Sequence, residues 1–307
     1  MFYYSFTKEV KSVVPNNTNN NLIEDLHNVK TQASAGSANL NVITVENELQ
    51  IAEDNQVTTK KVQQISLKEQ ILPTRYLRNY GTMGFEGQSA LLKSSVGIIG
   101  AGGLGGTIAE LLARMGVGHL VLIDNDQFED NNLNRQVLSQ ESNLGETKVS
   151  AAYTRITNIN SAVSVSPYTL KLNSNNAPEL LADCDILIDA LDNMSTRFIL
   201  QKTARELEIP MVHGAIGGFS GQVTTILPND RGLETLYSSL LETDSEQYQY
   251  PDKLAEVELG NPSATPAIVA SWQTQEAIKF LTNKGDLLRH RLLYLDSYTG
   301  NAEIIKY

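Results

Sequence analysis

Short apolar runs alternate with segments of helical periodicity over most of the chain. Each apolar run predicts a buried strand, and apolar residues spaced three or four apart between the runs predict helices packed on a sheet. The predicted strands start at Val96 and continue at residues 120–123, 163–165, 186–188 and 211–213; the predicted helices cover residues 148–159, 178–182 and 196–207. This order indicates an α/β fold with a Rossmann-like, doubly wound, mainly parallel sheet covered by helices on both faces.

The pattern changes after residue 218. A strand over residues 219–227, a helix over 264–281 and two strands at 292–295 and 302–305 predict additional antiparallel strands at the C-terminal end of the sheet. Between the first of these strands and the helix, residues 228–262 form a long polar segment with eight acidic and two basic residues. A loop of this length inside a compact domain is either a lid or binding loop, or it is disordered.

The first 70 residues lack this regularity. Residues 15–21 are nearly all asparagine and residues 32–41 are small and polar, which predicts loop or linker. Leu22 to Val29 predict a short amphipathic helix between them, and residues 42–45 and Ile51 suggest strands. We favour a partly ordered N-terminal extension over residues 1–70; the alternative is a small, degenerate β-grasp-like module. Residues 71–307 form the main domain, with helices expected near 68–79 and 85–92.

Charge and composition exclude several classes of protein. The formal net charge of −11 argues against a nucleic-acid partner, because such a partner requires a surface that neutralises phosphates. No apolar run approaches the roughly 20 residues that span a bilayer, so no membrane association is expected. The start of the chain shows no basic segment followed by an apolar one, so we expect a cytoplasmic protein.

The strongest chemical signal is the glycine-rich turn that follows the strand at Val96. Gly100, Gly102, Gly103 and Gly105 lie between that strand and a predicted helix. Such a turn brings backbone N–H groups to a helix N-terminus, where phosphate oxygens bind. Asp124 ends the next strand, 24 residues after Gly100, where an acid can bind the hydroxyls of a ribose. The sequence therefore predicts a nucleotide site, although a structural glycine turn is the simpler alternative.

Charged residues downstream fit this site. Arg135 and Lys148 are cations in an acidic chain and suit an anionic ligand, whereas either one alone would be interpreted as solvated. Asp189 and Asp192 follow the apolar run at residues 186–188, at the end of a parallel strand where ligands of such sheets bind. A carboxylate facing a triphosphate there would hold Mg²⁺. Both acids could instead cap the following helix.

The order of these motifs resembles the MoeB/ThiF/HesA family, relatives of the ubiquitin-activating enzymes. The resemblance covers about residues 71–307. The motifs that carry it are, in chain order, Arg75-Tyr76-Leu77-Arg78, Gly84-Phe85-Glu86-Gly87-Gln88, Gly100-Ala101-Gly102-Gly103-Leu104-Gly105, Asp124-Asn125-Asp126, Asn132-Leu133-Asn134-Arg135-Gln136, Gly145-x-x-Lys148 and Asp189-Ala190-Leu191-Asp192-Asn193.

The resemblance implies an ATP-dependent adenylyltransferase. Members of the family let a carboxylate attack the α-phosphate of Mg-ATP, which gives an acyl adenylate and pyrophosphate; the carboxylate is the Gly-Gly terminus of a small ubiquitin-like sulfur-carrier protein or another acid. By match to the motifs, Asp124 binds the ribose and Asp192 binds Mg²⁺. The phosphates are assigned to Asn132, Arg135 and Lys148, and the nucleotide motifs also include Asp126 and Gln136. Arg78 matches an arginine that reaches across a homodimer into the partner's site.

The cysteines depart from the family pattern. Most sulfur-carrier activators have two CxxC pairs that bind one structural Zn²⁺, whereas this chain has a single cysteine, Cys184. We therefore expect no zinc and no covalent thioester or persulfide. Cys184 starts an apolar strand, where a buried structural thiol is the expected state. His213 is the one histidine near the predicted site, and we interpret it as a satisfied histidine at a strand end.

Two other functions stay open at this point. An NAD-dependent oxidoreductase would use the same glycine turn, although it would not need the cations at Arg135 and Lys148. A non-catalytic nucleotide-binding module would keep the fold but not the charged residues. The sequence does not identify the carboxylate that is activated or the pathway that follows.

Overall fold

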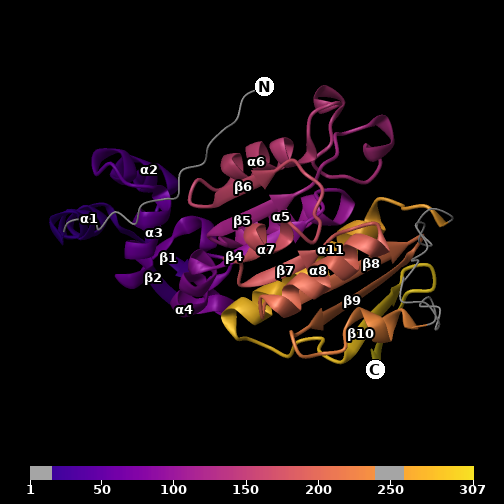
Figure 1. The fold of residues 1–307 in the computed structure, drawn as a ribbon. Coiled ribbons are helices and arrows are strands. Elements are labelled where there is room, and N and C mark those ends of the chain that lie inside the picture. Colours follow the sequence, from indigo (N-terminus) through magenta and orange to yellow (C-terminus); the bar gives the residue numbers. More distant parts are fainter. Residues whose placement is uncertain (1–15, 239–258) are drawn as a thin grey trace. The chain divides into compact units, whose positions relative to one another are not determined.

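The structure of the protein is a computed structural model that describes residues 16–238 and 259–307 (Figure 1). The chain divides into two compact units, Met1–Gly81 and Thr82–Tyr307. None of the described helices is both long and apolar enough to cross a membrane.

The first unit packs three helices with a small mixed sheet. Strand β1 (Thr31–Ala35) pairs antiparallel with β2 (Ala38–Ile43), and β2 pairs parallel with β3 (Ile71–Pro73). The remaining elements are α1 (Asn16–Val29), α2 (Val45–Asp54), α3 (Thr59–Lys68) and the 3₁₀ turn η1 (Thr74–Tyr76). Its core includes the buried side chains of Leu22, Leu26, Ile43, Ile51 and Val62.

Several predictions for this part of the chain were wrong. Residues 16–21 lie in α1 although their composition predicted a loop, because Leu22 and Leu26 anchor that helix in the core. Residues 32–41 were predicted as loop or linker but lie in the hairpin of β1 and β2, whereas the strand suggested at residues 42–45 is confirmed for residues 42 and 43. Ile51 lies in α2, whose N-terminus is capped by the Thr44 hydroxyl accepting from the Asn47 N–H.

The helix predicted over residues 68–79 is also wrong. Helix α3 ends at Lys68, and the chain continues as β3 and η1. The Thr58 hydroxyl accepts from the Lys61 N–H and sets the start of α3 at Thr59, nine residues before the predicted helix. The Thr44 and Thr58 caps explain why α2 and α3 were missed. Each cap begins a helix inside a segment where the apolar pattern alone gave no boundary.

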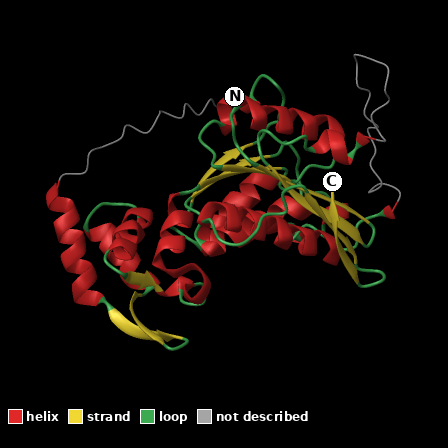
Figure 2. Cartoon of the chain, turned by 90° about the horizontal axis from the view of Figure 1, so that it is seen from below, coloured by secondary structure: helices red, strands yellow, loops and turns green. Residues whose placement is uncertain are grey.

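The second unit is built on one eight-stranded sheet, which confirms the predicted α/β class (Figure 2). The strand order is β11-β10-β9-β8-β7-β4-β5-β6. Pairings among β6, β5, β4, β7 and β8 are parallel, whereas β8–β9, β9–β10 and β10–β11 are antiparallel. The strands are β4 (Ser95–Ile99), β5 (His119–Ile123), β6 (Ser164–Tyr168), β7 (Ile186–Asp189), β8 (Met211–Gly217), β9 (Ser220–Ile226), β10 (Arg291–Asp296) and β11 (Asn301–Lys306).

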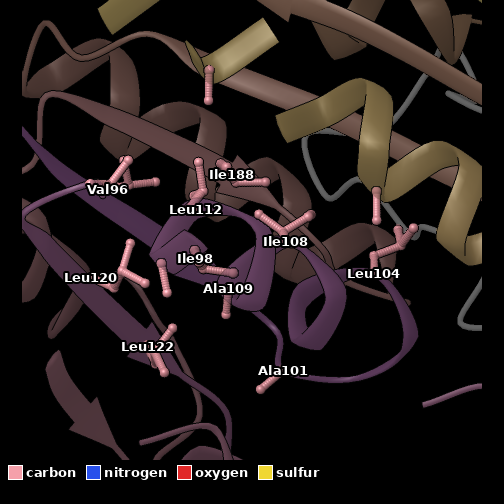
Figure 3. Close-up of a cluster of buried hydrophobic side chains, with 14 of the residues drawn as sticks. Val96, Ile98, Ala101, Leu104, Ile108, Ala109, Leu112, Leu120, Leu122 and Ile188 are labelled. Atoms are coloured by element: carbon pink, nitrogen blue, oxygen red, sulfur yellow. The ribbon is translucent and has the colours of Figure 1, made fainter. Parts of the chain in front are cut away.

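Helices cover both faces of this sheet. Ile98 points to one face, where it packs with Ile108 of α5 and other apolar residues of α6 and α11 (Figure 3). Its neighbour Ile99 belongs to the opposite face, with Leu181 of α7 and Leu200 of α8. The helices are α4 (Tyr80–Lys93), α5 (Gly103–Met115), α6 (Lys148–Ile159), α7 (Ala177–Leu181), α8 (Met194–Glu206), α9 (Leu233–Leu236) and α11 (Ala264–Thr282).

The strand order creates a switch point beside β4. From β4 the chain moves outward through β5 to β6, then returns to place β7 on the other side of β4. Loops leaving the carboxyl ends of β4 and β7 therefore diverge, and ligands of doubly wound sheets bind in the crevice between them. Of the polar segment predicted as a loop at 228–262, residues 233–236 form α9, and residues 239–258 lie outside the described part of the chain.

Candidate nucleotide site

A pocket of about 650 Å³ opens at this switch point in the second unit. Its volume is in the range of small-molecule and cofactor sites. The glycine turn after β4, the end of β5 and the loop after β7 supply most of its wall. The predicted residues that line it are Gly100, Gly102, Gly103, Asp124, Asp126, Arg135, Gln136, Lys148 and Asp192.

At the glycine turn the chain is folded tightly on itself, and the missing side chains leave room for a ligand. Gly100 has φ of +94°, and a Cβ there would lie 2.4 Å from the Ala190 carbonyl oxygen. A Cβ on Gly105 would lie 1.7 Å from the carbonyl oxygen of Gly100, so Gly105 shapes the turn from behind and does not line the pocket. The N-terminal amides of α5, which have no partner within the helix, begin at Gly103.

Asp124 is fixed at the end of β5 by two backbone amides. Its Oδ2 accepts from the Ala101 N–H at 2.7 Å and its Oδ1 from the Asp126 N–H at 2.8 Å. Burial raises the pKa of this carboxyl above its ordinary value, against the opposing effect of these hydrogen bonds and of Lys148. The carboxylate is thus an oriented acceptor at the pocket wall, as a ribose hydroxyl requires.

Two cations, Arg135 and Lys148, also line the pocket. The Lys148 Nζ lies 2.9 Å from Asp126 Oδ2, and the lysine side chain is only 9% exposed. Arg135 donates from Nη1 to the Asn131 carbonyl and to Asn134 Oδ1, each at 2.9 Å. Asp126 therefore holds the lysine in place, and both cations line the same pocket as the glycine turn.

Gln136 supplies an independent sign of a ligand. The side chain is buried, and it lies 3.5 Å from the position of a Cβ on Gly102. Its Oε1 has no hydrogen-bond partner within the described residues. A buried polar atom without a partner is costly unless a bound group satisfies it.

The structure separates the two acids after β7. Asp192 is exposed and lines the pocket, whereas Asp189 is fully buried below it. The Asp189 carboxylate contacts Arg197 and His213 instead. Neither acid caps α8, because Asn193 does so by accepting from the Thr196 N–H.

His213 is satisfied inside the protein, as predicted, although it lies within β8 and not at a strand end. Its Nδ1 lies 2.7 Å from Asp189 Oδ2, and its Nε2 lies 3.0 Å from the Tyr237 hydroxyl. Burial lowers the pKa of the imidazole, so the ring is neutral at physiological pH.

Two further predicted residues are not brought into the pocket. Asn132 is buried and closes the η2 turn (Asp130–Asn132), where its Oδ1 accepts from the Glu129 N–H. Arg78 belongs to the first unit, where it is exposed. A role of Arg78 at the nucleotide therefore stays a prediction.

Sequence reasoning missed several lining residues. Leu170, Lys171 and Leu172 follow β6, which ends at Tyr168 and not at residue 165 as predicted. The predicted strand was too short, so this loop was not placed at the carboxyl edge of the sheet. Ile216 and Asn261 also line the pocket, and no local motif marks them. The Asn134 side chain donates to the Asn261 carbonyl at 3.1 Å, which fixes that wall.

The donor set fits a nucleotide triphosphate. Helix amides, a guanidinium and an ammonium match phosphate oxygens, and Asp124 matches a ribose. The exposed carboxylate of Asp192 fits a hard divalent cation such as Mg²⁺. A Rossmann-like sheet with this pocket at its switch point defines a nucleotide-binding α/β protein.

The chain belongs to the ThiF family, whose sequence profile matches residues 76–307. The SAMP-activating enzyme E1 of Haloferax volcanii is 37% identical over 225 residues, which cover 73% of this chain and 81% of that protein. The sulfur carrier protein adenylyltransferase of Thermus thermophilus is 36% identical over 217 residues, which cover 70% and 79%. This chain spans about half the length of the matching plant proteins named adenylyltransferase and sulfurtransferase MOCS3.

The fold is also that of a solved enzyme. The crystal structure of Escherichia coli MccB with ATP superposes with a TM-score of 0.64 at 22% identity, over 91% of this chain and 94% of that one. The family and its named members identify the protein as an ATP-using adenylyltransferase. The alternatives of an NAD-dependent oxidoreductase and a non-catalytic module are therefore not kept.

Proposed function

We propose that the protein adenylates the C-terminal carboxylate of a small, ubiquitin-like sulfur-carrier protein that ends in Gly-Gly. The observation that carries the proposal is the convergence of the glycine turn, Arg135, Lys148 and Asp192 on one pocket. Relatives are named as activators of SAMP or of a sulfur carrier protein, which supports this class of substrate. The reaction requires ATP, which the cytoplasm supplies, and we expect the protein to act there.

The chemistry is a displacement at the α-phosphorus of ATP. A carboxylate oxygen forms a bond to phosphorus, the bond between phosphorus and the bridging α,β-oxygen breaks, and pyrophosphate leaves with that electron pair. Arg135 and Lys148 neutralise charge on the phosphate oxygens, and the α5 amides orient them. Asp124 accepts from the ribose and fixes the nucleotide along the pocket wall.

Asp192 is the proposed Mg²⁺ ligand. The ion, when bound, neutralises charge on the phosphates that leave as pyrophosphate. We propose no zinc site, because the single cysteine cannot supply the thiolates of the family's usual structural site.

We also propose a homodimer in which Arg78 completes the partner's site. Mixing Arg78→Ala with Lys148→Ala subunits should then restore part of the activity that each variant lacks, because one site of the heterodimer has both residues intact. A Lys148→Ala mixture with itself is the control. No recovery despite demonstrated subunit exchange would show that Arg78 does not act across subunits.

The function is tested by ATP–pyrophosphate exchange with small Gly-Gly-ending proteins from the same organism. Each candidate is supplied with a free C-terminal carboxylate and, as a matched control, with the same terminus amidated. We expect exchange only with the free carboxylate of the true substrate. Exchange that is equal with the amidated form, or absent with every candidate, would contradict the proposed substrate class.

A further inference from the structure

We propose that Arg197 and His213 are positioning residues, which hold the loop after β7 so that Asp192 faces the nucleotide pocket. The inference rests on the proposed function, since it concerns how the Mg²⁺ ligand is presented. Neither residue lines the pocket, and both side chains are fully buried. Both act through Asp189, the buried acid that ends β7.

Asp189 is the residue through which Arg197 and His213 contact the loop. Its Oδ2 lies 2.7 Å from His213 Nδ1 and 3.5 Å from Arg197 Nε, while its Oδ1 accepts from the Leu191 N–H at 3.1 Å. The carboxylate therefore bends the backbone back over itself one residue before Asp192. A buried carboxylate keeps such a position only while it is paired and hydrogen-bonded.

Arg197 closes the loop from the other side. Besides its contact with Asp189, its Nη2 donates to the Leu191 carbonyl oxygen. The N–H of Leu191 is thus held by Asp189 and its C=O by Arg197. Both backbone hydrogen-bonding groups of Leu191, the residue directly before Asp192, are therefore fixed by one buried ion pair.

The start of the loop is equally constrained. Gln273 of α11 donates from Nε2 to the Asp189 carbonyl at 2.8 Å, and the Ala190 N–H donates to the Ile99 carbonyl at 3.0 Å. The Ala190 carbonyl in turn lies against Gly100 of the phosphate-facing turn. Loop and glycine turn consequently share one contact surface, and a shift of Ala190 would alter both.

The hydrogen bonds of His213 form a consistent chain. The neutral ring donates from Nδ1 to Asp189, so Nε2 accepts a hydrogen bond from the Tyr237 hydroxyl at 3.0 Å. Gln222 donates from Nε2 to the Tyr237 oxygen at 2.7 Å. Every proton in the chain runs toward the Asp189 carboxylate, which stabilises it as an anion beside Arg197.

Charge and hydrogen-bonding capacity explain why the identity of the side chain matters at positions 197 and 213. One carboxylate and one guanidinium balance each other in a fully buried site, and a neutral histidine adds a donor without adding charge. A lysine at position 197 would keep the charge balance, but its single nitrogen cannot occupy the places of both Nε and Nη2. An asparagine at position 213 can donate from Nδ2 near the place of the imidazole Nδ1, whereas a leucine cannot.

The test uses the full chain with four variants: Arg197→Lys, His213→Leu, His213→Asn and, as a comparator, Asp192→Asn. Thermal unfolding first identifies which variants are folded. Calorimetry then measures ATP binding in EDTA and in Mg²⁺, and pyrophosphate exchange gives the Mg²⁺ concentration for half-maximal rate. The binding measurement does not depend on turnover.

We expect Arg197→Lys and His213→Leu to bind ATP in EDTA as the wild type does, but to lose the gain in affinity that Mg²⁺ provides. Their half-maximal Mg²⁺ concentration should rise roughly tenfold or more, as for outer contacts of metal ligands in general, and approach that of Asp192→Asn. His213→Asn should stay within about twofold of the wild type, because the donor to Asp189 is kept.

A folded Arg197→Lys protein with wild-type Mg²⁺ dependence would overturn the inference, whether or not His213→Leu folds. A loss in His213→Asn as large as that in Asp192→Asn would also overturn it, since the donor to Asp189 would not be what matters. A wild type that binds ATP no better with Mg²⁺ would overturn the proposed function itself, and the inference with it.

Discussion

At the scale of single residues, the pocket combines cations with polar neighbours that hold them in place. Lys148 is nearly buried against Asp126, and Arg135 is fixed by Asn131 and Asn134. These contacts orient both side chains before any phosphate binds. Preorganised charge of this kind stabilises a transition state more than it stabilises a bound substrate.

Removing either cation should therefore reduce catalysis while leaving the fold intact. We expect Arg135→Ala and Lys148→Ala each to lower the rate of pyrophosphate exchange by about 10²–10³-fold. Lys202→Ala on the exposed face of α8 is the matched control, because its side chain is 75% exposed and pairs only with Glu206 in the described contacts. Exchange at near wild-type rate in either pocket variant would refute the assignment.

Cys184 should have no part in the reaction. It is buried, and desolvation raises the pKa of its thiol to about 12, so almost no thiolate exists near neutral pH. We expect Cys184→Ser to keep full exchange activity with a stability loss of about 1 kcal/mol. Elemental analysis of the wild type should show far less than one zinc per chain. A thiol-sensitive adduct that disappears in Cys184→Ser would prove this view incorrect.

At the scale of elements, local chemistry made most of the second unit predictable. The strand, glycine turn, helix and acid from β4 to Asp124 follow one another without interruption, so spacing alone placed them. Lys148 was predicted as a cation downstream of the glycine turn in an acidic chain, and Asp192 as an acid after the apolar run at residues 186–188. The helix predicted over residues 148–159 coincides with α6.

What the sequence did not predict depends on contacts between distant segments. Asn261 reaches the pocket only through the path that leads into α11, and nothing in its neighbourhood marks it. From the sequence, Asp192 was already the favoured Mg²⁺ ligand of the two acids that follow the apolar run. What only the structure shows is that Asp189 is buried against Arg197 and His213. In the first unit, the helix predicted over Leu22 to Val29 is confirmed, but the asparagine-rich composition of residues 16–21 concealed the start of α1, which core packing stabilises.

The glycine turn gives an element-scale prediction. A Cβ on Gly105 would lie 1.7 Å from the Gly100 carbonyl, so Gly105→Ala must displace the turn from α5. We expect a loss of roughly 1–3 kcal/mol or more in the free energy of unfolding, together with loss of ATP binding. Gly81→Ala in α4 is the control, because a Cβ there has no atom within 4 Å and should not destabilise the protein. Unchanged ATP affinity in Gly105→Ala would show that the turn does not form the site.

At the scale of the whole molecule, the first unit has a buried polar cluster of its own. The first unit buries Glu48, whose carboxylate accepts from Gln63 Nε2 at 2.8 Å and lies 3.7 Å from Arg75. Gln63 in turn accepts from the Tyr76 hydroxyl at 3.1 Å. These hydrogen bonds connect α2, α3 and η1 within that unit. Desolvation outweighs them and raises the pKa of Glu48 from 4.5 to about 7.

This shift makes the stability of the protein depend on pH. Because the folded state binds the Glu48 proton more tightly than the unfolded state, its contribution is full below pH 4.5 and is lost as pH rises to about 7. The size is on the order of 3 kcal/mol. Denaturant unfolding at several pH values should show this decline in the wild type and not in Glu48→Gln. Glu24→Gln, at an exposed position of α1, is the control. Equal slopes in all three proteins would contradict the account.

The central claim is that a carboxylate oxygen forms a bond to the α-phosphorus of ATP in the pocket, and an oxygen label tests this directly. The substrate carboxylate is labelled with ¹⁸O, the reaction is run with ATP and Mg²⁺, and the adenylate is captured by a nucleophile. Attack on the α-phosphorus predicts one labelled oxygen in the released AMP and none in pyrophosphate. Label in inorganic phosphate with formation of ADP would mean attack on the γ-phosphorus, and would contradict adenylation at this site.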